Sequence, residues 1–288
     1  MLQIPGGIAI FCLLPVGIAI ALAAIMAPAG VSGAFLLLPL QFSVLAFTSP
    51  AVTPTNHLYN VVAIPSGVYR YVREGRMLWP LALIIAIGTV PGAILGSVLR
   101  VHLLSGKRGF TFLIAFVLLL IGLSLVRKIL RRKTPGPAKE NTDFRVEVTR
   151  FDVRRFEYRF RDRTHGVSSV GLSALTLAIG VIGGAYGVGG GAIISPILVA
   201  LYDLPVHTIA GATLFGTCLT SFVVVGWFAI TGPPPFWELG LLFGAGGLIG
   251  MYLGARVQRY LPARVIEVVL ACAVNFLAIT YLVTAILG

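Results

Sequence analysis

Long apolar stretches separated by short polar loops occupy most of this 288-residue chain, and they constrain its fold more than any other feature. A bilayer core about 30 Å thick is crossed by a helix of roughly 20 apolar residues. Only 11% of the residues are charged, whereas a soluble domain carries about 25%. We therefore predict an all-α polytopic membrane protein and exclude a water-soluble globular one.

Proline, glycine and charged residues divide the apolar stretches into about ten segments. These are 6–27, 33–47, 54–72, 77–99 and 109–127 in the first half, and 167–186, 190–203, 206–230, 236–257 and 263–286 in the second. Two of them, 33–47 and 190–203, are too short to cross a bilayer as straight helices. We expect these two to be half-helices or parts of broken helices.

The basic residues predict how the chain is oriented in the membrane. The segments 70–76, 127–165 and 256–264 hold three, thirteen and three of them, nineteen of the 22 lysines and arginines. Cytoplasmic loops of membrane proteins are enriched in such residues, which also favour contact with anionic lipids. We expect a multi-pass protein of the cell inner (cytoplasmic) membrane, with the central loop in the cytoplasm and both termini outside. The net charge of +12 is then explained by the basic cytoplasmic loops, and we do not expect nucleic-acid binding.

The central loop, residues 128–166, differs in composition from the rest of the chain. Its first part is rich in lysine, arginine and proline, as in a flexible linker at a lipid surface. In 143–160, aromatic and β-branched residues then alternate with polar ones, which is typical of strands. We predict a small β-ribbon here, able to pair with its equivalent in a second copy as a homodimer. The alternative is a disordered basic loop.

The two halves of the chain resemble each other. "GVSGAFLLLP" from Gly30 aligns without gaps with "GVGGGAIISP" from Gly187, and the downstream glycines Gly92 and Gly96 fall on Gly250 and Gly254. Five segments in each half place the second half in the opposite orientation. We therefore predict two inverted repeats, 1–127 and 167–288, an architecture of secondary transporters. The spaced glycines are predicted to be helix-packing faces.

The short segments begin at glycine-rich breaks. "GGAYGVGGGAIISP" lacks the preceding strand and following acid of a dinucleotide-binding loop, so a break in a membrane helix is the better interpretation. A helix that restarts there directs backbone N–H groups and a positive dipole end at an anion. Candidate substrate-binding residues at the two breaks are Ser32, Gly33, Gly189, Gly190 and Gly191. Close helix packing through small residues is the alternative.

The segment after each break is polar for a membrane helix. Asn56 and Asn60 share one helical face in the first half, and Thr213 and Thr217 share one in the second. Hydrogen-bond donors without a carboxylate suit an oxyanion, although such groups also bond neighbouring helices. His57, which aligns with Thr213, completes the candidate site and could carry a coupled proton.

"GAYGVGGGAIISPIL", followed by "AGATLFGTCLTSF", together with the central "VTRFDVRRFEYRFRDRTH", resembles the sulfite exporter TauE/SafE family of the TSUP transporters. The resemblance covers nearly the whole chain, although "GVSGAF" in the first half has fewer glycines than is usual in the family. It implies export of sulfite or organosulfonates across the cytoplasmic membrane.

We therefore predict a membrane transporter that exports a small sulfur oxyanion, sulfite or an organosulfonate, by alternating access. The alternative is an importer or channel for thiosulfate, a sulfonate or another small anion. We expect no enzymatic activity, no metal site and no cofactor, because the sequence contains no HExxH and no paired intramembrane aspartates.

Overall fold

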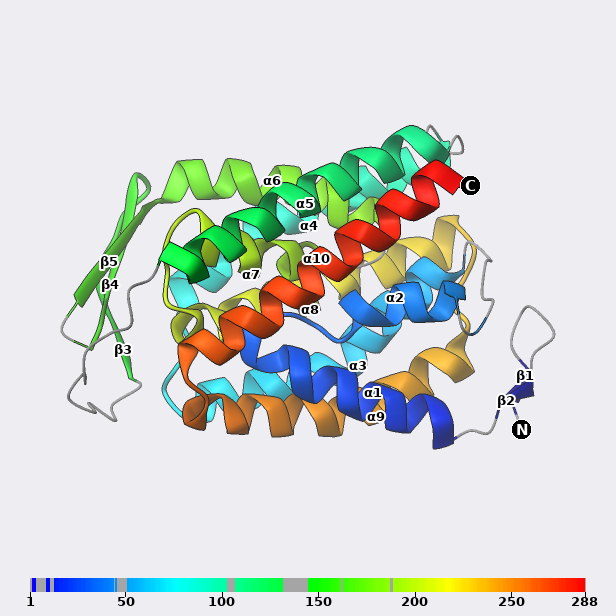
Figure 1. Cartoon of the computed structure of the whole chain (residues 1–288), viewed down its shortest axis with the longest axis horizontal. Coiled ribbons are helices and arrows are strands. Elements are labelled where there is room, and N and C mark those ends of the chain that lie inside the picture. Colours follow the sequence, from blue (N-terminus) through cyan, green and yellow to red (C-terminus); the bar gives the residue numbers. More distant parts are fainter. Residues whose placement is uncertain are drawn as a thin grey trace.

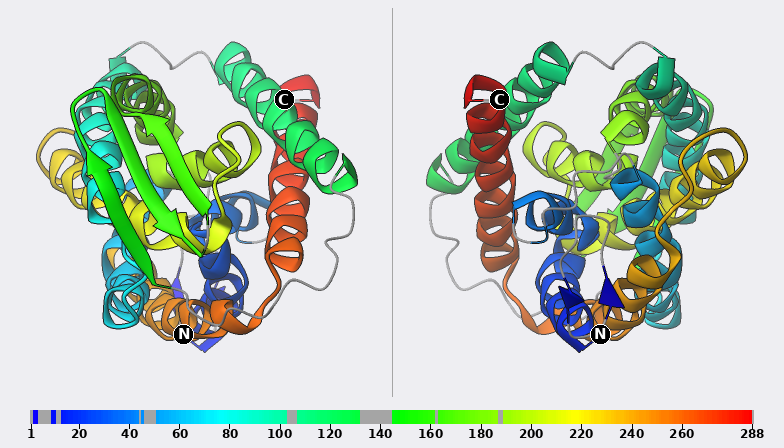
Figure 2. Two further views of the ribbon diagram at one scale, coloured as in Figure 1. Left: turned by 90° about the vertical axis from the view of Figure 1, so that its left-hand side faces the viewer. Right: turned by 90° about the vertical axis from the view of Figure 1, so that its right-hand side faces the viewer.

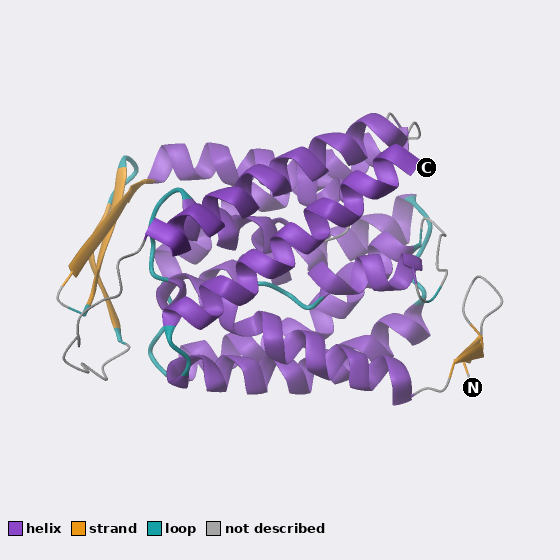
Figure 3. Cartoon of the chain, in the orientation of Figure 1, coloured by secondary structure: helices purple, strands orange, loops and turns teal. Residues whose placement is uncertain are grey.

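The computed structural model describes residues 2–3, 9–10, 13–43, 45, 51–102, 107–131, 145–161, 163–186 and 189–287. Helices form most of it, and a small three-stranded sheet lies at one end of the helical bundle (Figures 1 and 3). We call this end the sheet end. Helix α1 begins and helix α10 ends at the opposite end, which we call the far end (Figure 1).

The first half of the chain contains five α-helices. They are α1 (Leu13–Met26), α2 (Ala34–Ser43), α3 (Val52–Arg73), α4 (Trp79–His102) and α5 (Lys107–Arg131), with the short 3-10 helix η1 (Ala27–Ala29) after α1. The first helix begins seven residues later than the predicted segment 6–27. Ala9–Ile10 (β2) instead pairs with Leu2–Gln3 (β1), and residues 6–8 lie outside the described residues.

The second half of the chain contains five further α-helices. They are α6 (Ser169–Tyr186), α7 (Gly190–Ala200), α8 (Val206–Thr231), α9 (Trp237–Val257) and α10 (Ala263–Leu287), with the 3-10 helix η2 (Gln258–Tyr260) after α9. Within the described residues, four stretches are long and apolar enough to cross a membrane: Trp79–Leu99, Val206–Thr231, Trp237–Tyr260 and Ala263–Ile286. The short helices α2 and α7 have 10 and 11 residues, as the sequence predicts, and would span about half of a bilayer core.

Helix contacts in the two halves correspond pairwise. Helix α4 packs on α6 as α9 packs on α1, while α3 contacts α9 as α8 contacts α4. Glycines allow these helices to approach closely: a Cβ at Gly96 would lie 2.0 Å from the carbonyl oxygen of Val181, and one at Gly250 would lie 2.3 Å from that of Ile20. The prediction that these spaced glycines are packing faces is confirmed.

The sheet consists of β3 (Val146–Phe151), β4 (Arg155–Phe160) and β5 (Arg163–Ser168), antiparallel and in that order. It lies across the end of the bundle (Figure 2, left). Phe156 and Tyr158 are fully buried, and the Tyr158 hydroxyl lies 2.8 Å from Thr208 Oγ1 at the start of α8. Burial raises the pKa of this tyrosine, which therefore stays neutral. The predicted strands are confirmed, and the disordered alternative is wrong for 146–161 and 163–168. Strand β5 extends the predicted ribbon.

Candidate functional site

The two broken regions place two helix N-termini near one amide. Helix α7 lies toward the sheet end and α2 toward the far end (Figure 1), and each begins at a break inside the bundle. Ser32, just before α2, donates its hydroxyl to the Asn60 side-chain oxygen and accepts from the backbone N–H of Ala34 at 3.2 Å. A Cβ on Gly189, the N-cap of α7, would lie 3.5 Å from Asn60 Nδ2. Asn60 on α3 therefore lies between both helix starts.

Gly189 allows this close approach through its backbone conformation. Its φ is +81°, in the region that strains every residue with a side chain. A Cβ there would also lie 2.7 Å from the methyl carbon of Thr217. In the alignment of the two halves, Ser32 falls on Gly189. The first half therefore has a hydroxyl group at the position where the second half has no side chain.

A buried chain of hydrogen bonds connects Asn60 to the second half. Asn60 Nδ2 donates to Ser221 Oγ at 3.1 Å, and Ser221 Oγ lies 3.0 Å from His57 Nδ1. All three residues are fully buried. These hydrogen bonds therefore hold the His57 ring in a fixed orientation where α3 contacts α8.

Several polar atoms on α3 remain unpaired although they are buried. Both side-chain atoms of Asn56, Nε2 of His57 and the hydroxyl of Thr53 find no hydrogen-bond partner among the described residues. Their side chains are at most 1% exposed. Buried polar groups are nearly always hydrogen-bonded in folded proteins, so groups left unpaired require a ligand or water. Along one face of α3, unused hydrogen-bonding capacity runs from Asn60 toward the far end.

The remaining predicted residues lie close by but are occupied by packing or backbone bonds. Thr213 donates to the carbonyl oxygen of Gly30 at 2.7 Å, and Thr217 donates to that of Thr213 at 2.8 Å. Cβ atoms built on Gly33, Gly190 and Gly191 would lie within 3 Å of Tyr59, Thr89 and Thr217, respectively. The structure therefore brings Ser32, Asn60, His57 and Gly189 together, with Asn56 one turn along α3.

Three further residues were not among the predicted site residues. Ser221 lies one turn beyond Thr217 on the same helical face, which is a detectable signal. Thr53 begins the polar face of α3. Gln41 on α2 is fully buried with both amide atoms unpaired among the described residues, and its only sequence signal is a lone amide in an apolar half-helix.

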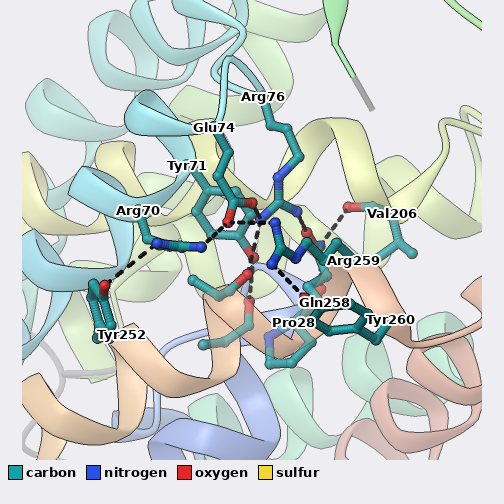
Figure 4. A network of polar contacts seen from close by, with 12 residues as sticks. Pro28, Arg70, Tyr71, Glu74, Arg76, Val206, Tyr252, Gln258, Arg259 and Tyr260 are labelled. Carbon is teal, nitrogen blue, oxygen red and sulfur yellow. Dashed lines mark hydrogen bonds and ion pairs between the residues drawn. The ribbon is translucent and has the colours of Figure 1, made fainter. Parts of the chain in front are cut away.

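At the sheet end, a second polar cluster connects the two halves (Figure 4). Arg76, 1% exposed, follows α3 and donates to Gln258 Oε1, to Glu74 and, at 2.9 Å, to the carbonyl oxygen of Ala255. Gln258 in turn donates to the carbonyl oxygen of Pro28 at 2.7 Å. These bonds join the α3–α4 connection, the end of α9 and η1. These bonds therefore hold the two halves together at the sheet end.

Positive groups outnumber negative groups in this cluster. The carboxylate of Glu74 lies 2.5 Å from Arg70 and 3.8 Å from Arg259, in addition to its bond with Arg76. Three guanidinium groups therefore share one carboxylate. No cluster of His, Cys, Asp or Glu that could hold a metal ion occurs within the part of the chain that the structure describes.

An apolar bundle with half-helices and buried polar groups defines a polytopic membrane protein. The model of the family "Sulfite exporter TauE/SafE" matches residues 14–281, so the chain belongs to that family of membrane transporters. The predicted family resemblance is confirmed.

Curated relatives agree with this assignment. The chain is 24% identical over 206 residues to the "Probable membrane transporter protein YunE" of Bacillus subtilis, covering 71% of this chain and 70% of the relative. It is 28% identical over 105 residues to the "Probable membrane transporter protein YdhB" of the same organism, covering 36% of this chain and 42% of the relative. No solved structure matches.

Proposed function

We propose that this transporter exports a small sulfur oxyanion, sulfite or an organosulfonate, by alternating access. The observation that carries the proposal is the meeting of two half-helix starts at Asn60, beside unpaired buried donors on α3. Helix N-termini attract anions through free N–H groups and the helix dipole. An oxyanion would supply the acceptors that Asn56 Nδ2 and His57 Nε2 lack.

The sequence around this site carries no formal charge. Residues 1–69 and 204–237 contain no Asp, Glu, Lys or Arg. An anion would therefore be held by neutral donors and helix dipoles, without a carboxylate to repel it. In the proposed arrangement, Ser221 donates to His57 Nδ1, which leaves the ring proton on Nε2 to face the anion.

Inverted repeats provide the proposed mechanism of alternating access. The pairwise correspondence of helix contacts supports two five-helix repeats that can rock against each other around the fixed breaks. The Arg76–Gln258 tie would close the sheet end in this state. Rearrangement of the tie would then admit the anion from that side.

We also propose an orientation and a location. The sheet would lie in the cytoplasm, with α1 beginning and α10 ending outside the cell inner membrane, because nineteen of the 22 basic residues then lie inside. A cysteine at exposed Arg154, in a chain whose native cysteines are replaced, should resist an impermeant thiol reagent in intact cells. Rapid labelling without permeabilisation would overturn this orientation.

Transport itself is tested in proteoliposomes. Purified protein should carry labelled sulfite or a sulfonate with saturation, and unlabelled substrate on the other side should stimulate exchange. A channel for thiosulfate or another anion would pass current without such exchange, and an importer would work only in the opposite orientation. Applying a pH gradient in each direction would reveal proton coupling. Failure to move any sulfur anion would overturn the proposed function.

A further inference from the structure

We propose that the outer edge of β3 is the dimerisation surface of this protein, pairing antiparallel with β3 of a second copy. In the described sheet, β4 covers one edge of β3 and no described strand covers the other. Val148 and Phe151, at this edge, are 44% and 56% exposed. Open edges of this kind readily accept another strand.

A bulge in β3 sets which side chains share a face. The pairing with β4 shifts between Val148 and Arg150, so Thr149 is an extra residue. Residues three apart normally point to opposite faces of a strand. Here Glu147 pairs with Arg159, and Arg150 pairs with Glu157, so both charges lie on one face.

The charges of β3 are then self-complementary under two-fold symmetry. In an antiparallel pair centred between Val148 and Thr149, Glu147 faces Arg150 of the second copy, and the reverse pair forms as well. Across the joined sheet, the paired residues of neighbouring strands form a row. Each row consists of Arg159 and Glu147 of one copy followed by Arg150 and Glu157 of the second copy, so positive and negative charges alternate along it. Centring the pair on Glu147 or on Arg150 would instead place like charges together.

The opposite face of β3 supplies apolar contacts in the same register. Val146 and Phe151 pair with Phe160 and Phe156 of β4, so they share the face turned to the bundle. In the proposed dimer, each Val146 meets Phe151 of the second copy. The pairing would therefore cover exposed apolar surface as well as pair charges.

Pairing through this edge also fixes how the two copies would be oriented relative to each other. The sheet lies across the end of the bundle, so an axis perpendicular to the sheet runs along the bundle (Figure 2, left). A two-fold axis between antiparallel edge strands has this direction. Both copies would then cross one membrane in the same orientation.

Charge reversal provides the test, with full-length protein in lipid nanodiscs and native mass spectrometry as the measurement. Wild type should be dimeric. Glu147→Arg alone and Arg150→Glu alone should each lower the dimer fraction at least tenfold, since each places like charges in both rows. Mixing the two variants should restore dimers that contain one copy of each, because both rows are then complementary.

The mixture also shows that both variants remain folded. Arg163→Glu, an equal charge change on the exposed strand β5, is the matched control and should dimerise like wild type. A monomeric wild type, single variants that dimerise normally, or no preference for mixed dimers would each overturn the proposal. Loss of dimers in Arg163→Glu alone would assign the interface to β5 instead.

Discussion

Helices α3 and α8 occupy equivalent places in the two halves, yet their polar side chains differ in their hydrogen bonding. On α3, Thr53, Asn56 and His57 leave buried donors and acceptors unpaired among the described residues. On α8, the hydroxyls of Thr213 and Thr217 bond to backbone carbonyls. The first half therefore holds the spare hydrogen-bonding capacity, while the second half supplies the glycine-started helix α7 and a rigid support.

For Asn56, this difference follows from the residue type. A threonine in a helix can satisfy its hydroxyl on the carbonyl four residues earlier, as Thr217 does. The planar amide of an asparagine carries two donors as well as an acceptor and needs partners beyond its own turn. Buried amides on α3 are therefore the groups that a ligand would satisfy.

The largest effect is expected at Asn60, where both helix starts meet. Asn60→Leu removes the bonds to Ser32 and Ser221 together with a donor for the ligand. A hydrogen bond to a charged ligand contributes about 1.5–3 kcal/mol, and the neutral bonds that orient Ser32 and Ser221 are lost as well, so sulfite binding should weaken more than about 100-fold. Isothermal titration of the purified variant measures this.

Asn275→Leu is the matched control, since Asn275 donates to Ala271 of its own helix at 2.7 Å. It should bind sulfite like wild type. Normal sulfite binding by Asn60→Leu would remove Asn60 from the site.

Asn56→Leu separates binding from stability. Its amide has no partner among the described residues, so an apolar group of similar shape should leave the thermal unfolding midpoint unchanged or raise it. Sulfite affinity should fall roughly 10- to 150-fold. Thermal unfolding and titration of the same sample provide both values, and a large loss of stability would indicate a structural amide.

Thr213→Val should show the opposite behaviour. It removes the donor to Gly30 and leaves that carbonyl oxygen unpaired, which costs about 1–3 kcal/mol of stability. Folded protein should keep sulfite affinity close to that of wild type. Chemical unfolding in detergent measures the change in stability, and titration measures the sulfite affinity. A variant of normal stability that has lost affinity would place Thr213 among the ligand groups.

Thr217→Val should have the smallest effect. Valine keeps the methyl carbon that packs near Gly189 and removes only a bond within α8. Stability should change by no more than about 0.5 kcal/mol, with affinity unaffected. A clear loss of transport rate in proteoliposomes would show that the Thr217 hydroxyl takes part in the substrate site.

Much of this arrangement could be predicted from the sequence because it follows local rules. Segment lengths identified the half-helices α2 and α7, period-two alternation identified β3 and β4, and glycine spacing identified the packing face at Gly250. Sequence also predicted Ser32, Asn60 and Gly189 near one another, through the aligned breaks.

Side-chain pairing could not be predicted in the same way. Whether the Thr213 hydroxyl faces a ligand or the Gly30 carbonyl depends on how two distant segments dock. Ser221 shares a helical face with Thr217, but the sequence does not show that its hydroxyl meets Asn60 and His57. The hydrogen bond between Arg76 and Gln258 joins residues 182 positions apart. Long-range packing decides which polar groups stay unpaired.

A high-resolution structure of the protein in nanodiscs with sulfite is the most direct test of α3 as the binding helix. The account predicts density for one anion within hydrogen-bonding distance of Asn56 Nδ2 and His57 Nε2, near the starts of α2 and α7. An anion bound elsewhere, with Asn56 and His57 still unpaired, would contradict it.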